Sequence, residues 1–142
     1  EEAYAIPFGE ANVTREGDDV TIVTLGRMLH VAHEAADALA KEKISCEVVD
    51  LRTTSPMDTD TIIESVENTG RLVVLDESHP RCSIATDVSA IVAQEAFGAL
   101  KAPIRMVTAP HVPVPFAENL EDLYIPDAGQ VQQAVRTVMG KD

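Results

Sequence analysis

Short apolar segments alternate with helical patterns along almost the whole chain. Val, Ile and Leu follow one another in four strand-like segments, at residues 20–25, 45–51, 72–75 and 104–107. Apolar residues then recur at intervals of three and four, which predicts helices at residues 28–41, 58–70, 83–97 and from 127 through Val138. Such alternation is typical of right-handed βαβ units around a mainly parallel sheet. The sequence therefore predicts an α/β fold with three αβα layers, formed by a single domain that spans residues 1–142.

The stretch before the first strand predicts one more strand. Residues 16–19, Glu-Gly-Asp-Asp, are a turn signal, so residues 10–15 are expected to pair antiparallel with the strand at 20–25. The sheet should then have about five strands, mostly parallel with one antiparallel, and helices on both faces.

Two of the expected helices carry recognisable ends. Asp58 is a plausible N-cap for the helix that Gly70 closes. Asp127 and Gln130 are spaced as a capping pair that opens the last helix.

Residues 109–126 form the one long irregular stretch. Pro110, Pro113, Pro115 and Pro126 are expected to hold the backbone extended and to exclude a helix there. A loop this long in a compact domain usually carries function or a docking surface.

No self-contained catalytic motif is found. The first strand ends in Leu25-Gly26-Arg27-Met28, and neither GxGxxG nor GxxxxGK[ST] occurs anywhere in the chain. This disfavours a standard NAD, FAD or nucleoside triphosphate site. The acidic residues are mostly solitary, so spacing defines no acid/base pair. We therefore assign no catalytic, cofactor-binding or metal-binding residue.

Two weaker patterns remain open. His30 and His33 lie three apart on an expected helix beside Glu34, which permits a metal site but equally an ordinary helix surface. Cys82 and His79 lie in the polar stretch 76–82 at the carboxyl end of a buried strand, which permits a cysteine nucleophile but equally a structural loop.

The charge balance limits the partners. Eleven basic and 24 acidic residues give a formal net charge of −13, which argues against nucleic acid or an anionic membrane and permits a basic protein partner. Glu118, Glu121 and Asp122 beside Tyr124 form an acidic, aromatic feature that suits such a partner.

Other sequence features concern the cellular compartment of the protein and whether the chain is a fragment. No apolar run approaches the roughly 18 residues that span a bilayer, and residues 1–4 carry no secretion signal. Cys46 and Cys82 do not suggest a disulfide framework, so we expect a reducing, cytoplasmic compartment, with a mitochondrial origin left open. Because residue 1 is Glu rather than Met, we expect a fragment of a longer chain.

Several stretches together resemble a known domain. IPFG at residues 6–9 and REGDDVTIV at residues 15–23 resemble the start of the C-terminal domain of transketolase-type enzymes. VDLRTTSPMD at residues 49–58 is similar to that family's V-D-L-R-(T/S)-(L/I)-x-P-x-D stretch and departs from it at Thr54. TAPHVPVPF at 108–116 and YIP at 124–126 resemble its tail. The likeness is greater still to β subunits of the decarboxylating component of 2-oxo acid dehydrogenase complexes, and PRCSIATD at 80–87 is most similar to the acetoin branch.

The resemblance implies an assembly role. The parent enzyme would decarboxylate a 2-oxo acid, or cleave acetoin, with thiamin diphosphate and Mg²⁺ and pass the acyl group to lipoamide. Its cofactor-activating groups lie outside this domain, so the isolated domain is expected to be inactive and to bind no cofactor. The implied partners are a second β subunit, α subunits and the basic subunit-binding domain of the acyltransferase core. As interface residues we select His79, Pro80, Arg81, His111, Phe116, Glu118, Glu121, Asp122, Tyr124 and Lys141.

A different class of function competes with this one. A stand-alone flavodoxin-like module would bind a ligand in the crevice at the carboxyl end of its sheet.

Overall fold

The sheet has five strands and is mostly parallel, as the sequence predicts. The computed structural model describes residues 4–141, and the strand order is β1-β3-β2-β4-β5. The neighbours β3, β2, β4 and β5 are parallel, whereas β1 runs antiparallel to β3. The strands are β1 (Asn12–Arg15), β2 (Val20–Thr24), β3 (Cys46–Asp50), β4 (Leu72–Asp76) and β5 (Arg105–Thr108).

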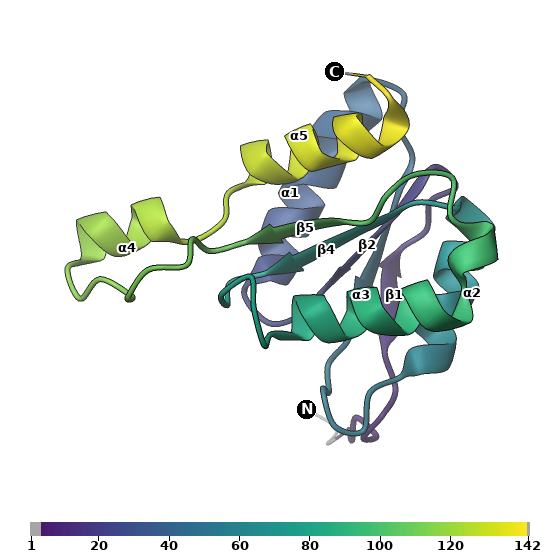
Figure 1. Ribbon diagram of the computed structural model, residues 1–142, viewed down its shortest axis with the longest axis horizontal. Helices are drawn as coiled ribbons and strands as arrows, with labels where there is room; N and C mark the ends of the chain where they lie inside the picture. Colours follow the sequence, from purple (N-terminus) through teal and green to yellow (C-terminus); the bar gives the residue numbers. More distant parts are fainter. Residues whose placement is uncertain (1–3, 142) are drawn as a thin grey trace.

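Helices cover both faces of this sheet (Figure 1). On one face lie α1 (Met28–Lys41) and α5 (Ala128–Met139), and on the other lie α2 (Thr59–Thr69) and α3 (Ile84–Glu95). This arrangement confirms the three αβα layers. Two short helices complete the described chain, η1 (Phe97–Ala99) and α4 (Glu118–Tyr124). In the described part of the chain, no helix is both long and apolar enough to cross a bilayer.

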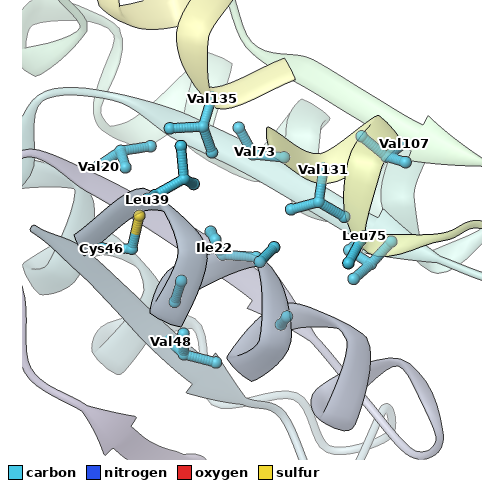
Figure 2. Packing of buried hydrophobic residues seen from close by; sticks show 14 of the residues in the cluster. Val20, Ile22, Leu39, Cys46, Val48, Val73, Leu75, Val107, Val131 and Val135 are labelled. Carbon is cyan, nitrogen blue, oxygen red and sulfur yellow. The ribbon is translucent and has the colours of Figure 1, made fainter. Parts of the chain in front are cut away.

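Each face of the sheet has its own apolar core. Successive residues of a strand point to opposite faces, so Ile22 belongs to the cluster under α1 and α5, and Val23 belongs to the one under α2 and α3. In the first cluster, Leu39 of α1 and Val135 of α5 pack against the strands (Figure 2). All four of these side chains are fully buried.

The predicted helix ends are confirmed. Asp58 caps α2, because its Oδ1 accepts a hydrogen bond from the Thr61 N–H at 3.1 Å. Gly70 ends the helix with a φ of 75°, a left-handed conformation that glycine adopts without steric cost. Asp127 and Gln130 form a reciprocal capping box at the start of α5, with distances of 2.8 and 3.1 Å.

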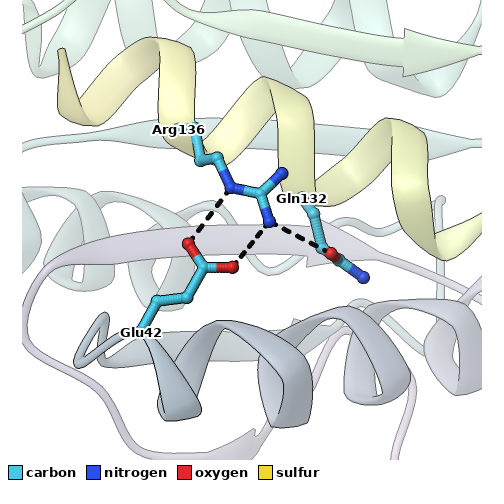
Figure 3. A network of polar contacts seen from close by, with 3 residues as sticks. All are labelled: Glu42, Gln132 and Arg136. Atoms are coloured by element: carbon cyan, nitrogen blue, oxygen red, sulfur yellow. Dashed lines mark hydrogen bonds and ion pairs between the residues drawn. The ribbon is translucent and has the colours of Figure 1, made fainter. Parts of the chain in front are cut away.

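A polar contact joins α1 to α5 at the surface (Figure 3). Arg136 donates to both carboxylate oxygens of Glu42, at 2.6 and 3.1 Å, and to Gln132 Oε1 at 3.3 Å. The hydrogen bonds from Arg136 lower the pKa of Glu42.

The predicted partner of the first strand is wrong. β1 was expected to form a hairpin with the strand at 20–25, but it pairs with β3 through Asn12–Asp50 and Val13–Val49. The reason is that β2 lies inside the sheet, where parallel β3 and β4 occupy both of its edges. Residues 16–19 therefore carry the chain across β3 rather than folding it back on itself.

The exclusion of a helix from residues 109–126 is also wrong. α4 forms at Glu118–Tyr124, in a segment that lies between Pro115 and Pro126 and contains no proline of its own. The prolines exclude a helix only from the residues next to them.

Candidate functional site: a projecting arm and its base

Residues 110–125, here called the arm, leave the sheet after β5 and carry α4. The arm lies beyond the ends of β4 and β5, apart from the layered body (Figure 1). Its apolar side chains are unusually exposed, since Phe116 is 102% and Leu123 is 83% accessible. Val112, Val114 and Leu120 are also more than half exposed. The arm thus presents an apolar surface that a protein normally covers.

The apolar surface was only partly predicted. Phe116 was selected from the sequence, but Leu120 and Leu123 were not. These two leucines lie three residues apart in α4 and therefore share one side of the helix. A leucine pair at this spacing, between prolines and carboxylates, was the signal that could have found them.

Acidic residues lie on the same short helix. Glu118, Glu121 and Asp122 are all exposed on α4, as selected from the sequence. Residues 110–126 contain no Lys or Arg. The arm therefore combines apolar and negative character.

At the base of the arm, three aromatic side chains meet. Tyr124 is only 8% exposed, and its hydroxyl lies 3.2 Å from His79 Nδ1. The His79 ring meets His111 edge-on, with centroids 5.6 Å apart, and Tyr124 at 6.5 Å. These three residues, here called the ring cluster, were all selected from the sequence, although 45 positions separate His79 from Tyr124.

A buried carboxylate shapes the loop that holds His79. Asp76, 4% exposed at the end of β4, accepts hydrogen bonds from the Ser78 N–H and Oγ–H at 2.9 and 2.8 Å. Its other oxygen lies 3.4 Å from the Ala85 N–H in the first turn of α3. The Ser78 carbonyl in turn accepts from the Ala109 N–H at 3.1 Å. This loop thereby supports both His79 and the start of the arm.

The other selected residues are placed differently. Pro80 is half-buried and Arg81 exposed in the loop after His79. Lys141 is exposed after α5, and the chain ends at the end of α5 that lies away from α4 (Figure 1). The structure does not bring Lys141 to the other candidates.

Neither the His30 and His33 pair nor the Cys82 and His79 pair is joined by the further side chains that a metal or catalytic site requires. His33 Nε2 lies 2.9 Å from the Thr14 hydroxyl, and His30 is exposed. Within residues 4–141, no three His, Cys, Asp or Glu side chains are placed to hold a metal ion. Cys82 is exposed, and His79, its proposed base, contacts Tyr124 and His111 instead.

The sheet crevice has the wrong charge for a phosphate group. It measures about 270 Å³ at the carboxyl ends of β2 and β4. Asp76 and Glu77 line it, and no Lys or Arg does. A thiamin diphosphate, flavin or dinucleotide phosphate needs cations or free N–H groups, so these residues do not fit such a group.

Comparison with known proteins decides the family. The model of the family described as "Transketolase, C-terminal domain" matches residues 9–131. The chain belongs to the transketolase C-terminal domain family. The resemblance inferred from the sequence motifs is thereby confirmed.

Relatives of this transketolase C-terminal domain include β subunits of two enzymes. It is 68% identical over 139 residues to the acetoin:2,6-dichlorophenolindophenol oxidoreductase subunit beta of Cupriavidus necator, covering 98% of this chain and 41% of that protein. It is 49% identical over 138 residues to the pyruvate dehydrogenase E1 component subunit beta of Rickettsia bellii, covering 97% and 42%. The chain thus spans about two fifths of the length of these relatives.

A solved structure shares the fold of this transketolase C-terminal domain. It is described as a split gene transketolase, inactive beta4 tetramer, and is 30% identical with a TM-score of 0.82. The match covers 99% of this chain and 46% of that one.

Proposed function

We propose that this chain is an assembly domain of the β subunit of a thiamin diphosphate-dependent acetoin or 2-oxo acid dehydrogenase. The relatives that it matches over nearly its whole length are β subunits of acetoin and pyruvate enzymes. The parent enzyme would cleave acetoin or decarboxylate a 2-oxo acid and pass the acyl group to lipoamide. The contribution of this domain is to hold subunits together.

The observation that carries the proposal is the exposure of the arm's apolar side chains. A phenylalanine that is 102% accessible gains nothing from the fold of its own chain. Burying such side chains against a partner releases about 25 cal/mol per Å² of apolar area. A few side chains buried in well-packed pockets near the centre of an interface supply most of its affinity. We therefore propose that Phe116 and Leu123 dock into a neighbouring subunit.

The partners proposed are a second β subunit, α subunits and the basic subunit-binding domain of the acyltransferase core. A related chain assembles as a beta4 tetramer, which supports contact between β subunits. The carboxylates of α4 suit the basic domain, because opposite charges speed encounter and fix orientation.

Catalysis is not proposed for this chain. The carboxylate-lined crevice suits no diphosphate, as argued above. We expect calorimetric titration of this chain with thiamin diphosphate and Mg²⁺ to show no binding. Micromolar affinity would contradict the assembly-only role.

The arm is tested by two polar substitutions in the β subunit that carries this domain. Phe116→Ser and Leu123→Ser should each weaken assembly with the other subunits, on the order of tenfold or more in dissociation constant. Sedimentation velocity across a concentration series measures this. Circular dichroism melts of the 142-residue chain on its own should stay unchanged, since both side chains are exposed there.

Phe97→Ser is the matched control. Phe97 is also exposed, at 73%, but lies in η1 between α3 and β5. It should leave assembly unchanged. An equal loss from Phe97→Ser, or no loss from the two arm variants, would reject the arm as the docking surface.

A further inference from the structure

The helix layer formed by α2 and α3 carries charge of one sign. Neither helix contains Lys or Arg. Their acidic residues are Asp60, Glu64, Glu67, Asp87 and Glu95. In the opposite layer, formed by α1 and α5, the charges of Glu34 and Asp37 are balanced by those of Lys41 and Arg136. The negative charge of the domain is therefore distributed unevenly between its two helix layers.

A groove of about 600 Å³ lies between α2 and α3. Its lining includes Asp60, Ile63 and Glu64 of α2 together with Ile91 and Glu95 of α3. Within residues 4–141, no Lys or Arg lines it. The groove thus places two apolar side chains among three carboxylates.

The two isoleucines are only partly covered by the domain itself. Ile63 is half-buried and packs at the border of the apolar cluster under α2 and α3. Ile91 is also half-buried, and it belongs to neither apolar cluster of the described chain. Covering apolar surface of this kind is favourable, so a partner gains by contacting both side chains.

The carboxylates around the isoleucines lack cations. In the described part of the chain, Asp60, Glu64 and Glu95 are exposed and form no ion pair. Asp60 and Glu64 lie four residues apart on α2, and Glu64 and Glu67 lie three apart. Like charges at these spacings repel each other and destabilise a helix. A basic partner in the groove would relieve this repulsion, so its charge complements that of the groove.

The shape of the groove favours a helix as its occupant. The walls are two helices that cover the sheet, so no strand edge is available for a partner strand to extend. An amphipathic helix packs its apolar side chains into such a groove at intervals of three and four residues. Flanking Lys and Arg side chains can lie along the apolar surface and still reach the carboxylates.

We propose that the groove between α2 and α3 binds a basic amphipathic helix of a partner protein. This site is separate from the arm, because α2 and α4 lie at opposite sides of the domain (Figure 1). Both surfaces can therefore be occupied at once. The proposal goes beyond the proposed function and does not depend on it.

Calorimetric titration of the 142-residue chain with a synthetic helix tests the groove. The probe is a peptide of about 14 residues that has leucines on one helical face and lysines elsewhere. It should bind with a dissociation constant on the order of 10 µM at about 0.05 M NaCl and on the order of tenfold more weakly at about 0.3 M. A second peptide of the same composition, with the leucines scattered around the helix, should bind at least about tenfold more weakly. Amide chemical shifts on binding should change at residues 59–67 and 87–95.

Two pairs of variants separate the groove from the overall charge. Glu64→Gln combined with Glu95→Gln should weaken binding of the first peptide about tenfold. Glu10→Gln combined with Glu34→Gln is the matched control, because it removes the same charge from exposed positions outside the groove. This control should bind as the wild-type chain does.

A matched pair of isoleucine variants tests the apolar contact. Ile91→Ser should also weaken binding about tenfold. Ile6→Ser is the control, since Ile6 is exposed and lies outside the groove, and it should leave the affinity unchanged.

Several outcomes would reject the groove as a helix-binding site. These are equal affinity for the two peptides, equal losses from groove and control variants, and shift changes centred on the arm or on α1 and α5. A dimer of the chain alone that Ile91→Ser dissociates would show that a second copy occupies the groove instead. The arm variants described above test subunit assembly separately, so either proposal can fail while the other stands.

Discussion

Asp58 links two distant parts of the chain through one carboxylate. Its Oδ1 accepts from the Thr61 N–H, and its Oδ2 accepts from the Thr61 hydroxyl and the Ala11 N–H, both at 2.8 Å. Asp58 therefore caps α2 and fixes the segment that leads into β1. The acidic residue that closes the VDLRTTSPMD motif thus has a structural explanation and needs no catalytic one.

Asp58→Asn tests this role. Burial alone would raise the pKa of Asp58, but the hydrogen bonds from Ala11 and Thr61 together hold it below its ordinary value of 3.8. A carboxyl with a depressed folded-state pKa stabilises the fold above its unfolded pKa, and this is lost as pH falls through the folded pKa. The variant should lose about 1 kcal/mol at neutral pH.

Urea unfolding across a pH series measures the effect. The difference between wild type and Asp58→Asn should be constant above about pH 5 and shrink toward about pH 2. Asp60→Asn is the control, since Asp60 is exposed one residue into α2. A difference that does not depend on pH would show that the carboxylate charge contributes nothing.

The two cysteines should differ sharply in reactivity. Burial raises the pKa of the Cys46 thiol to about 11, and its side chain is only 1% exposed. Cys82 is exposed. Because the thiolate is the reactive form, iodoacetamide at neutral pH should label Cys82 alone in the folded chain and both cysteines in denaturant.

The rate at which iodoacetamide labels Cys82 tests the alternative that Cys82 is a catalytic nucleophile. Labelling no faster than that of a free thiol would exclude an activated nucleophile. Labelling of Cys46 at a comparable rate in the folded chain would contradict its burial.

Among the elements, local sequence signals predicted where helices and strands lie better than they predicted which strands pair. The capping residues Asp58 and Asp127 marked two helix starts correctly, because capping depends on residues within one turn. The partner of β1 depends on which edges of β2 remain free, and that is settled by β3 and β4 far along the chain. No pattern in residues 10–25 carries that information.

For the candidate site, too, the sequence indicated the local features but not the contacts between distant residues. The prolines and carboxylates of residues 109–126 pointed to a docking segment, and the structure finds exposed apolar side chains there. The contact of His79 with His111 and Tyr124 could not be derived, because it joins a loop after β4 to the two ends of the arm. Side chains so far apart in sequence meet only through the arrangement of the whole sheet.

Gly17 is required where the connection from β1 to β2 crosses β3. A Cβ at this position would lie 2.2 Å from the Cys46 carbonyl carbon and 2.3 Å from the Glu47 nitrogen. Because both are backbone atoms, a strand must move to make room. Gly17→Ala should therefore destabilise the fold by about 1–3 kcal/mol.

Gly98→Ala provides the comparison. Nothing lies within 4 Å of a Cβ there, so thermal and urea unfolding should be almost unchanged. Equal effects at the two positions would contradict the close approach at Gly17.

At the scale of the whole molecule, the net charge of −13 should govern encounter with a basic partner. Long-range attraction between opposite charges raises association rates and is screened by salt. Stopped-flow mixing of this chain with the partner proposed above, the basic subunit-binding domain, should show association on the order of tenfold slower at about 0.5 M than at about 0.05 M NaCl. The dissociation rate should change less. An association rate independent of salt would rule out electrostatic steering.

The packing of the core and the exposed surface of the arm depend on almost entirely different residues. Neither apolar cluster draws a member from residues 110–124, and of the arm only its last residue, Ile125, packs against the cluster under α1 and α5. Substitutions at the exposed positions of this range, such as Val112, Phe116 and Leu123, should leave the packing between sheet and helices untouched. The exposed surface of the arm can therefore be redesigned while the sheet and its covering helices keep their packing.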